Sequence, residues 1–93
     1  MLHVRELLFD DWNEEHIAQH HIIPEEVEEV CLDDPFVSST RKGRLRIIGQ
    51  TDAGRYLAII LAPRGRGVYY PITARDATAA ERRLYRRQKG QRR

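Results

Sequence analysis

The stretch Tyr56-Leu57-Ala58-Ile59-Ile60-Leu61-Ala62 is the longest apolar run in the chain, and it decides the fold class. Seven consecutive apolar residues are typical of a β-strand that is covered on both faces. We therefore expect 56–62 to form the centre of a sheet. Glycine-bearing turns flank this run, with 51–54 before it and a loop at 63–67 after it.

Three further segments around this run have the character of strands. Residues 36–40 are β-branched and hydroxyl-rich, and a turn at 41–43 joins them to 44–50, where Leu45 and Ile47 alternate with charged positions. Residues 68–74 contain Pro71, which indicates an edge strand or a bulge. The pattern predicts an antiparallel meander of about four strands, with a possible short N-terminal edge strand at 6–9.

Three segments have helical signals. Asp11 and Glu14 form a D-x-x-E pattern that predicts a helix over 12–20, and Pro24 opens a second helix that ends before Asp33. A complete capping box, Thr78-Ala79-Ala80-Glu81, opens a third helix over 79–89, which we expect to dock through Ala80, Leu84 and Tyr85. The expected fold class is therefore α+β, with two N-terminal helices and one C-terminal helix.

Length and composition place the chain among small globular proteins. Its 93 residues predict one domain over 1–93, with a frayed basic tail at about 90–93. The single cysteine, Cys31, excludes an internal disulfide or a thiolate cluster, and its helical position predicts a small buried hydrophobe. No stretch is typical of a membrane span or a signal peptide, so we expect a cytoplasmic protein.

The formal net charge of +2 conceals a strong asymmetry. Residues 1–40 carry −10, from one base and eleven acids, whereas residues 41–93 carry +12, from fifteen bases and three acids. The two halves either neutralise each other in the fold or leave a cationic face that attracts polyanions. Fourteen of the sixteen bases are arginine, which pairs with phosphate through a planar fork.

Two motifs indicate specific chemistry only weakly. His16 and His20 have a spacing that could ligate a metal, with His21 beside them, but a structural or solvated role is favoured and we predict neither a metal nor a cofactor. Gly65-Arg66-Gly67 lacks the lysine and the following helix of a phosphate loop, and it is better interpreted as a hairpin connection.

The arginines are the principal candidates for function. Cleaving RNA without a metal requires positive charge near the developing phosphorane, and arginine suits that task. Alternation places Arg44 and Arg46 on one side of their strand, Arg55 begins the next strand, and Arg75 ends the last, so a meander could bring them together. The alternative, which composition favours, is that they are solvated charges or partners of the acidic helices.

The chain resembles the BrnT toxins over about 7–87. The resemblance is carried by Phe9-Asp10-Asp11-Trp12-Asn13, by Arg44 ahead of Ile48-Gly49, by Gly54-Arg55, and most specifically by Thr73-Ala74-Arg75-Asp76-Ala77-Thr78 with Glu81 and Tyr85. It implies a RelE-like α+β domain that acts as the RNA-cleaving toxin of a type II toxin–antitoxin pair. The implied antitoxin covers the active face and can carry a ribbon-helix-helix DNA-binding segment; a homodimer is a further possibility.

The resemblance also assigns residues. It makes Arg44, Arg55 and Arg75 catalytic candidates, with Glu81 and Tyr85 in weaker roles in proton transfer or positioning. RNA-binding candidates on the cationic surface are Arg46, Tyr70, Arg82, Arg83 and Arg86.

Three positions depart from the family pattern. Tyr70 stands where the family usually has an arginine, His21 stands where glycine is common, and Ile23 replaces the serine that caps the second helix. A tyrosine can instead stack on a base.

Two other classes of function fit the same features. A catalytically silent module could hold RNA or an acidic protein with the same cationic face, and its binding would weaken steeply with salt. A DNA-binding role for the arginines at 82–87 ranks last, because no helix-turn-helix partner precedes them.

Overall fold

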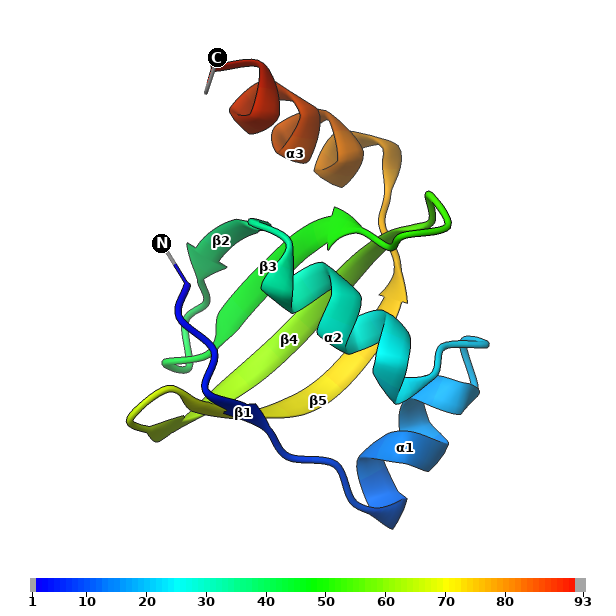
Figure 1. Ribbon diagram of the computed structural model, residues 1–93, viewed down its shortest axis with the longest axis vertical. Helices are drawn as coiled ribbons and strands as arrows, with labels where there is room; N and C mark the ends of the chain where they lie inside the picture. Colours follow the sequence, from blue (N-terminus) through cyan, green and yellow to red (C-terminus); the bar gives the residue numbers. More distant parts are fainter. Residues whose placement is uncertain (1, 92–93) are drawn as a thin grey trace.

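The computed structural model describes residues 2–91 and shows five strands and three helices (Figure 1). The predicted α+β class, with two N-terminal helices and one C-terminal helix, is confirmed. In chain order the elements are β1 (Glu6–Leu7), α1 (Asp11–Ala18), α2 (Pro24–Leu32), β2 (Phe36–Ser39), β3 (Leu45–Gln50), β4 (Tyr56–Gly65), β5 (Val68–Asp76) and α3 (Ala79–Gln91).

All five strands form one sheet in the order β1-β5-β4-β3-β2. The central strand is β4, as its apolar run predicts. Strands β2 to β5 pair with their neighbours in antiparallel fashion, whereas β1 pairs with β5 in parallel. The sheet is therefore mixed rather than a plain antiparallel meander.

Strand β5 is irregular at Pro71. Ile60 pairs with Thr73 and Leu61 pairs with Pro71, so Ile72 is left between two registers as a bulge. Pro71 has no N–H to donate, and the neighbouring strand β1 ends opposite Tyr69, before it reaches the proline. The predicted bulge is confirmed.

The loop predicted at 63–67 is wrong, because β4 continues to Gly65. Only Arg66 and Gly67 lie between the strands, with φ values of 57° and 79°. Two consecutive positive φ angles are the geometry of a tight two-residue hairpin turn.

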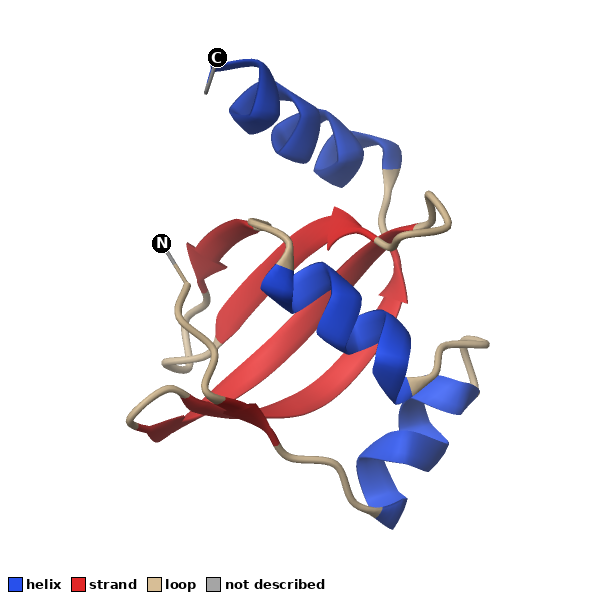
Figure 2. Cartoon of the chain, in the orientation of Figure 1, coloured by secondary structure: helices blue, strands red, loops and turns tan. Residues whose placement is uncertain are grey.

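Helix α2 crosses in front of the sheet in Figure 2, whereas α3 lies beyond its upper end in this view. On one face α1 and α2 pack Ile17, Val27 and Val30 against Ile47 and Ile59. Cys31 is buried in the same cluster as predicted, and burial raises the pKa of its thiol to about 12. On the other face α3 packs against β2 and β3. No helix within residues 2–91 has the length and apolar character needed to cross a membrane.

The helix ends confirm two of the three predicted start signals. Helix α2 begins at Pro24, and in α3 the Thr78 and Glu81 side chains exchange hydrogen bonds with each other's backbone N–H. In α1 the N-cap is Asp10 rather than Asp11, and its capping partner is Asn13. The helix at 79–89 extends through Gly90 to Gln91, and the rest of the predicted tail, 92–93, lies outside the described residues.

The predicted docking side of α3 is partly wrong. Ala80 is exposed, whereas Glu81 and Tyr85 are buried and Leu84 packs at the edge of the interface. The helix therefore turns a charged residue toward the sheet, and that residue organises the site described below.

Asn13 ties α1 to the irregular part of the sheet. Its buried side-chain amide donates to the carbonyl oxygens of Leu8 at 2.9 Å and Pro71 at 3.0 Å. We expect Asn13→Ala to lower the free energy of unfolding by about 2 to 4 kcal/mol, because it leaves one buried carbonyl and one partly buried carbonyl without their donor. Urea denaturation measures the change.

Gln19→Ala, at the exposed end of the same helix, is the control and should change stability by less than about 0.5 kcal/mol. Equal effects of the two substitutions would show that the amide of Asn13 is not a structural tie.

Candidate functional site

Helix α3 covers only part of its sheet face. The register aligns Ser38, Arg46, Ile60 and Thr73 in one row across the four antiparallel strands. Ile60 remains partly exposed in the central strand, whereas Ile59, on the opposite face, is fully buried. We call this uncovered area the open face. The expectation that β4 is covered on both faces along its apolar run is therefore only partly correct.

Arg75 and Glu81 form a paired group beside the open face. Arg75 Nη1 lies 2.7 Å from Glu81 Oε1, and Arg75 Nη2 lies 2.9 Å from Glu81 Oε2. Glu81 is buried, with 6% of its surface exposed, and it also accepts a hydrogen bond from the Thr78 N–H. The Arg75 guanidinium is the main cause that lowers the pKa of Glu81 to about 2, so Glu81 is a carboxylate at neutral pH.

Arg46 approaches the same carboxylate from β3. Its Nη1 lies 3.7 Å from Glu81 Oε2, and its Nε donates to the Ser38 hydroxyl at 3.3 Å. The side chain is 34% exposed, and its two terminal nitrogens make no hydrogen bond within the described residues. Two guanidinium groups therefore meet around one buried carboxylate, with donors left over for an anion.

Arg44 and Tyr70 lie one row further along the same sheet face. Tyr70 pairs with Ala62, and the register of β3 continues to place exposed Arg44 opposite Ala62. The Tyr70 hydroxyl donates to the Asp10 carboxylate at 3.0 Å, and the Arg64 guanidinium carbon lies 5.1 Å from the ring centroid. Partial burial and the bond to Asp10 raise the pKa of Tyr70.

The expected gathering of arginines fails for Arg55. Its guanidinium donates to the carbonyl oxygens of His20 and His21 at 2.8 and 2.6 Å, and it pairs with Asp76 at 2.9 Å and with Glu26 at 3.4 Å. These contacts hold the loop between α1 and α2, on the face opposite Arg75. For Arg55, pairing with an acidic helix is the correct alternative.

The remaining candidates belong to α3. Tyr85 is buried against Ile48 and Ala58, so it packs the helix onto the sheet rather than reaching the open face. Arg82 and Arg86 stack near the Tyr56 ring, with guanidinium carbons 5.9 and 6.0 Å from its centroid. Exposed Arg83 makes neither contact, and among the described residues none of these three arginines shares the hydrogen bonds or ion pairs of Arg46.

The histidines do not assemble a metal site. Within the part of the chain that the structure describes, no three His, Cys, Asp or Glu side chains are grouped to hold an ion. The His16 ring stacks on Trp12 at 5.1 Å between centroids, and the His20 and His21 carbonyls bind Arg55.

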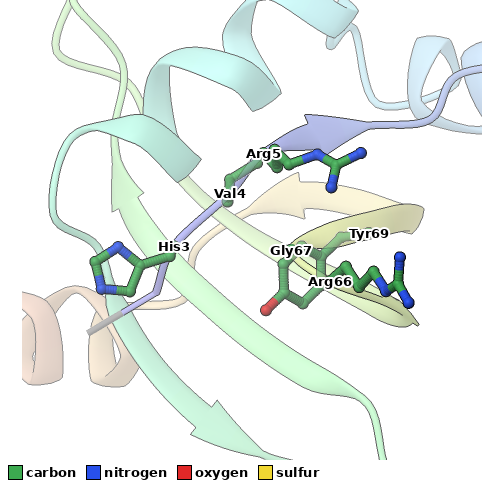
Figure 3. Close-up of a pocket in the computed structure, with 6 residues that line it drawn as sticks. All are labelled: His3, Val4, Arg5, Arg66, Gly67 and Tyr69. Atoms are coloured by element: carbon green, nitrogen blue, oxygen red, sulfur yellow. The ribbon is translucent and has the colours of Figure 1, made fainter.

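A separate hollow lies between the N-terminal segment and the β4–β5 turn (Figure 3). It is lined by His3, Val4, Arg5, Arg66, Gly67 and Tyr69. Val68, next to this hollow, is seven residues from Arg75 along β5, a separation of about 20 Å. The hollow is therefore distinct from the pair formed by Arg75 and Glu81.

The sequence interpretation missed two residues of the site. Ser38 orients Arg46, and Thr78 helps to hold Glu81 in place. The capping box identified Thr78 and Glu81 as a pair, but only the cross-strand register shows that Ser38 lies beside Arg46.

We expect Arg55 to stabilise the fold. We expect Arg55→Gln to lower the free energy of unfolding by about 2 to 4 kcal/mol, since it removes charged hydrogen bonds to two carbonyls and ion pairs to Glu26 and Asp76. Arg41→Gln, in the exposed β2–β3 turn, should change stability little. Urea denaturation of both variants measures these changes. Similar losses of unfolding free energy in Arg55→Gln and Arg41→Gln would contradict the structural role of Arg55.

Glu81 should make the free energy of unfolding depend on pH in the acidic range. A carboxylate whose pKa falls from 4.5 to about 2 on folding adds stability above pH 4.5, and this stability is lost as the pH falls toward 2. The size of the shift corresponds to about 3 kcal/mol. The difference in unfolding free energy between the natural protein and Glu81→Gln should therefore narrow between pH 5 and pH 2.

Glu25→Gln, an exposed position of α2, is the matched control, and its difference from the natural protein should vary little over this range. A constant difference for Glu81→Gln would mean that the carboxylate does not hold α3 by its charge.

The chain was also compared with known protein families, curated proteins and solved structures. No family model, curated protein or solved structure matches the chain. The candidate site therefore depends on the arrangement of Arg46, Arg75 and Glu81 itself.

Proposed function

We propose that this protein binds single-stranded RNA on the open face and cleaves it without a metal, as the toxin of a type II toxin–antitoxin pair. The observation that carries the proposal is the meeting of Arg46 and Arg75 around Glu81, beside the part of the sheet face that α3 leaves uncovered. Two oriented guanidinium groups match the anionic oxygens of one phosphate.

The chemistry of such a site is electrostatic. The 2′-oxygen of the ribose attacks phosphorus, the bond to the 5′-oxygen breaks, and a cyclic phosphate and a free 5′-hydroxyl result. Arg46 and Arg75 stabilise the charge that develops on the phosphoryl oxygens. Glu81 is ionised and engaged on both oxygens, so it is a positioning residue. The 2′-hydroxyl proton passes to water, and water supplies the proton that the leaving 5′-oxygen takes up.

The backbone at His21 supports the resemblance to the BrnT toxins. His21 has a φ of 60°, a conformation that favours glycine, and it occupies the position where the family commonly has glycine. The same position thus has a structural demand that explains the family's residue. With the resemblance come the proposed partners, which are an antitoxin that covers the open face, in some cases with a ribbon-helix-helix segment, and a second copy of the chain.

A second function, RNA binding without turnover, is favoured by one specific observation. The four histidines lie in the N-terminal segment, in α1 or directly after it, and Glu81 is held as a carboxylate. The open face thus offers hydrogen-bond donors that can bind a phosphate, but it has no side chain that titrates near neutral pH. Such a face could bind an RNA strand or an acidic protein and release it unchanged.

Binding and cleavage of a labelled single-stranded RNA in EDTA test both functions. We expect Arg46→Gln and Arg75→Gln each to weaken binding about tenfold or more, because each removes a charged hydrogen bond to phosphate. Each variant should also lower the slope of log affinity against log salt by about 0.7. Arg75→Gln should remove cleavage.

Arg5→Gln removes the same charge at a site away from the open face and should leave specific binding within about twofold. Binding that depends on Arg46 and Arg75 without any cleavage would favour the silent module. Equal effects of all three variants would show that the open face is not an RNA site.

A further inference from the structure

A second hollow lies beside the C-terminal half of α3. It is lined by Asp33, Gln50, Tyr56, Tyr85, Arg86, Lys89 and Gly90. Gln50 and Tyr56 pair across β3 and β4 at the end of the sheet. The hollow thus combines aromatic rings, hydrogen-bonding groups and cations from four segments of the chain.

Two tyrosines supply the aromatic surface. The Tyr56 and Tyr85 rings meet edge to face, with centroids 6.0 Å apart and an interplanar angle of 75°. Tyr85 is buried, whereas Tyr56 remains partly exposed at the hollow. A partly exposed ring held in place by a buried one offers a rigid aromatic surface. The Arg82 guanidinium carbon lies 5.9 Å from the Tyr56 centroid, so a planar base that stacks on this ring takes the place of the Arg82 side chain.

The cations beside this platform have no acidic partner. Lys89 Nζ lies 5.5 Å from the Tyr85 ring centroid, and the Arg86 guanidinium carbon lies 6.0 Å from that of Tyr56. Neither cation forms an ion pair within the part of the chain that the structure describes. Unpaired cations next to an aromatic platform are suited to a phosphate that continues from a stacked base.

The polar rim of the hollow favours bases with an amino group. Gln50 donates its side-chain N–H to the Gly54 carbonyl at 3.0 Å, which leaves its oxygen as an acceptor. Asp33 adds an exposed carboxylate, which is also an acceptor. Cytosine offers an N4 amino group to such a rim, whereas uracil presents a carbonyl oxygen at the same place.

We propose that this hollow binds one nucleotide, with its base stacked on Tyr56, its amino group facing Asp33 and Gln50, and its phosphate at Arg86 and Lys89. Tyr56 lies two residues from Ala58, the partner of Arg75, about 7 Å along β4. The inference rests on the proposed function in one respect: this nucleotide belongs to the same RNA strand as the phosphate bound at Arg75.

Titration with CMP and UMP, followed by amide shifts in NMR spectra, tests the hollow without requiring an intact RNA strand. We expect shifts at Gln50 and Lys89 and at least fivefold tighter binding of CMP than of UMP. Asp33→Asn should abolish this preference, because an amide can donate as well as accept. Glu25→Gln removes an equal charge on α2 and should preserve the preference.

Tyr56→Leu should weaken binding of both nucleotides fivefold or more through lost stacking. Since that variant alters the packing of α3, the exposed pair Arg86→Gln and Arg87→Gln gives an independent comparison on one helix. Arg86→Gln should weaken CMP binding about tenfold, and Arg87→Gln should change it less than twofold.

The outcomes separate the two proposals. If RNA binds through Arg46 and Arg75 while CMP produces no shifts in the hollow, the nucleotide site is wrong and the proposed function stands. If CMP binds as expected and RNA does not, the hollow is a nucleotide site and the proposed function fails. Equal losses in Arg86→Gln and Arg87→Gln would reduce the binding to general attraction and overturn the inference.

Discussion

The carboxylate of Glu81 is the interaction on which the placement of α3 and of the arginines both depend. It is buried, and a buried charge is costly unless it is paired and hydrogen-bonded. Arg75 satisfies both of its oxygens and Thr78 adds an N–H donor, while Arg46 lies within ion-pair distance. Docking of the helix and orientation of the Arg75 guanidinium are therefore coupled through this carboxylate.

The fold separates the charges of the chain rather than mixing them. The acidic helices α1 and α2 lie on one face of the sheet, whereas α3 and the open face lie on the other. Between described residues, the pair formed by Glu26 and Arg55 is the ion pair that joins the acidic block to the basic one. The small net charge is therefore the sum of an acidic face and a basic face. The electrostatic field of the protein attracts a polyanion to the arginines and repels it from α1 and α2.

Local signals in the sequence predicted much of the fold but less of the site. The apolar run of β4, Pro24 and the capping box at Thr78 each act within a few residues, so their outcomes could be anticipated. The opposite placements of Arg55 and Arg75 depend on the register between β4 and β5, which no local pattern encodes. The helical spacing of Tyr85 predicts that it docks α3 on the sheet, and its burial confirms this; its weaker role in proton transfer or positioning was implied only by the resemblance.

Tyr70 holds a cation at the sheet face through its aromatic ring. Its hydroxyl donates a hydrogen bond to the Asp10 carboxylate, which fixes the orientation of the ring on β5. Arg64, from the neighbouring strand β4, then places its guanidinium over that ring, 5.1 Å from the centroid. The stacked cation adds a positive charge to the sheet face that carries Arg44 and Arg46. The Asp10 carboxylate offsets part of this charge, so the Arg64 guanidinium contributes to the long-range attraction of polyanions more than to the alignment of one anionic group.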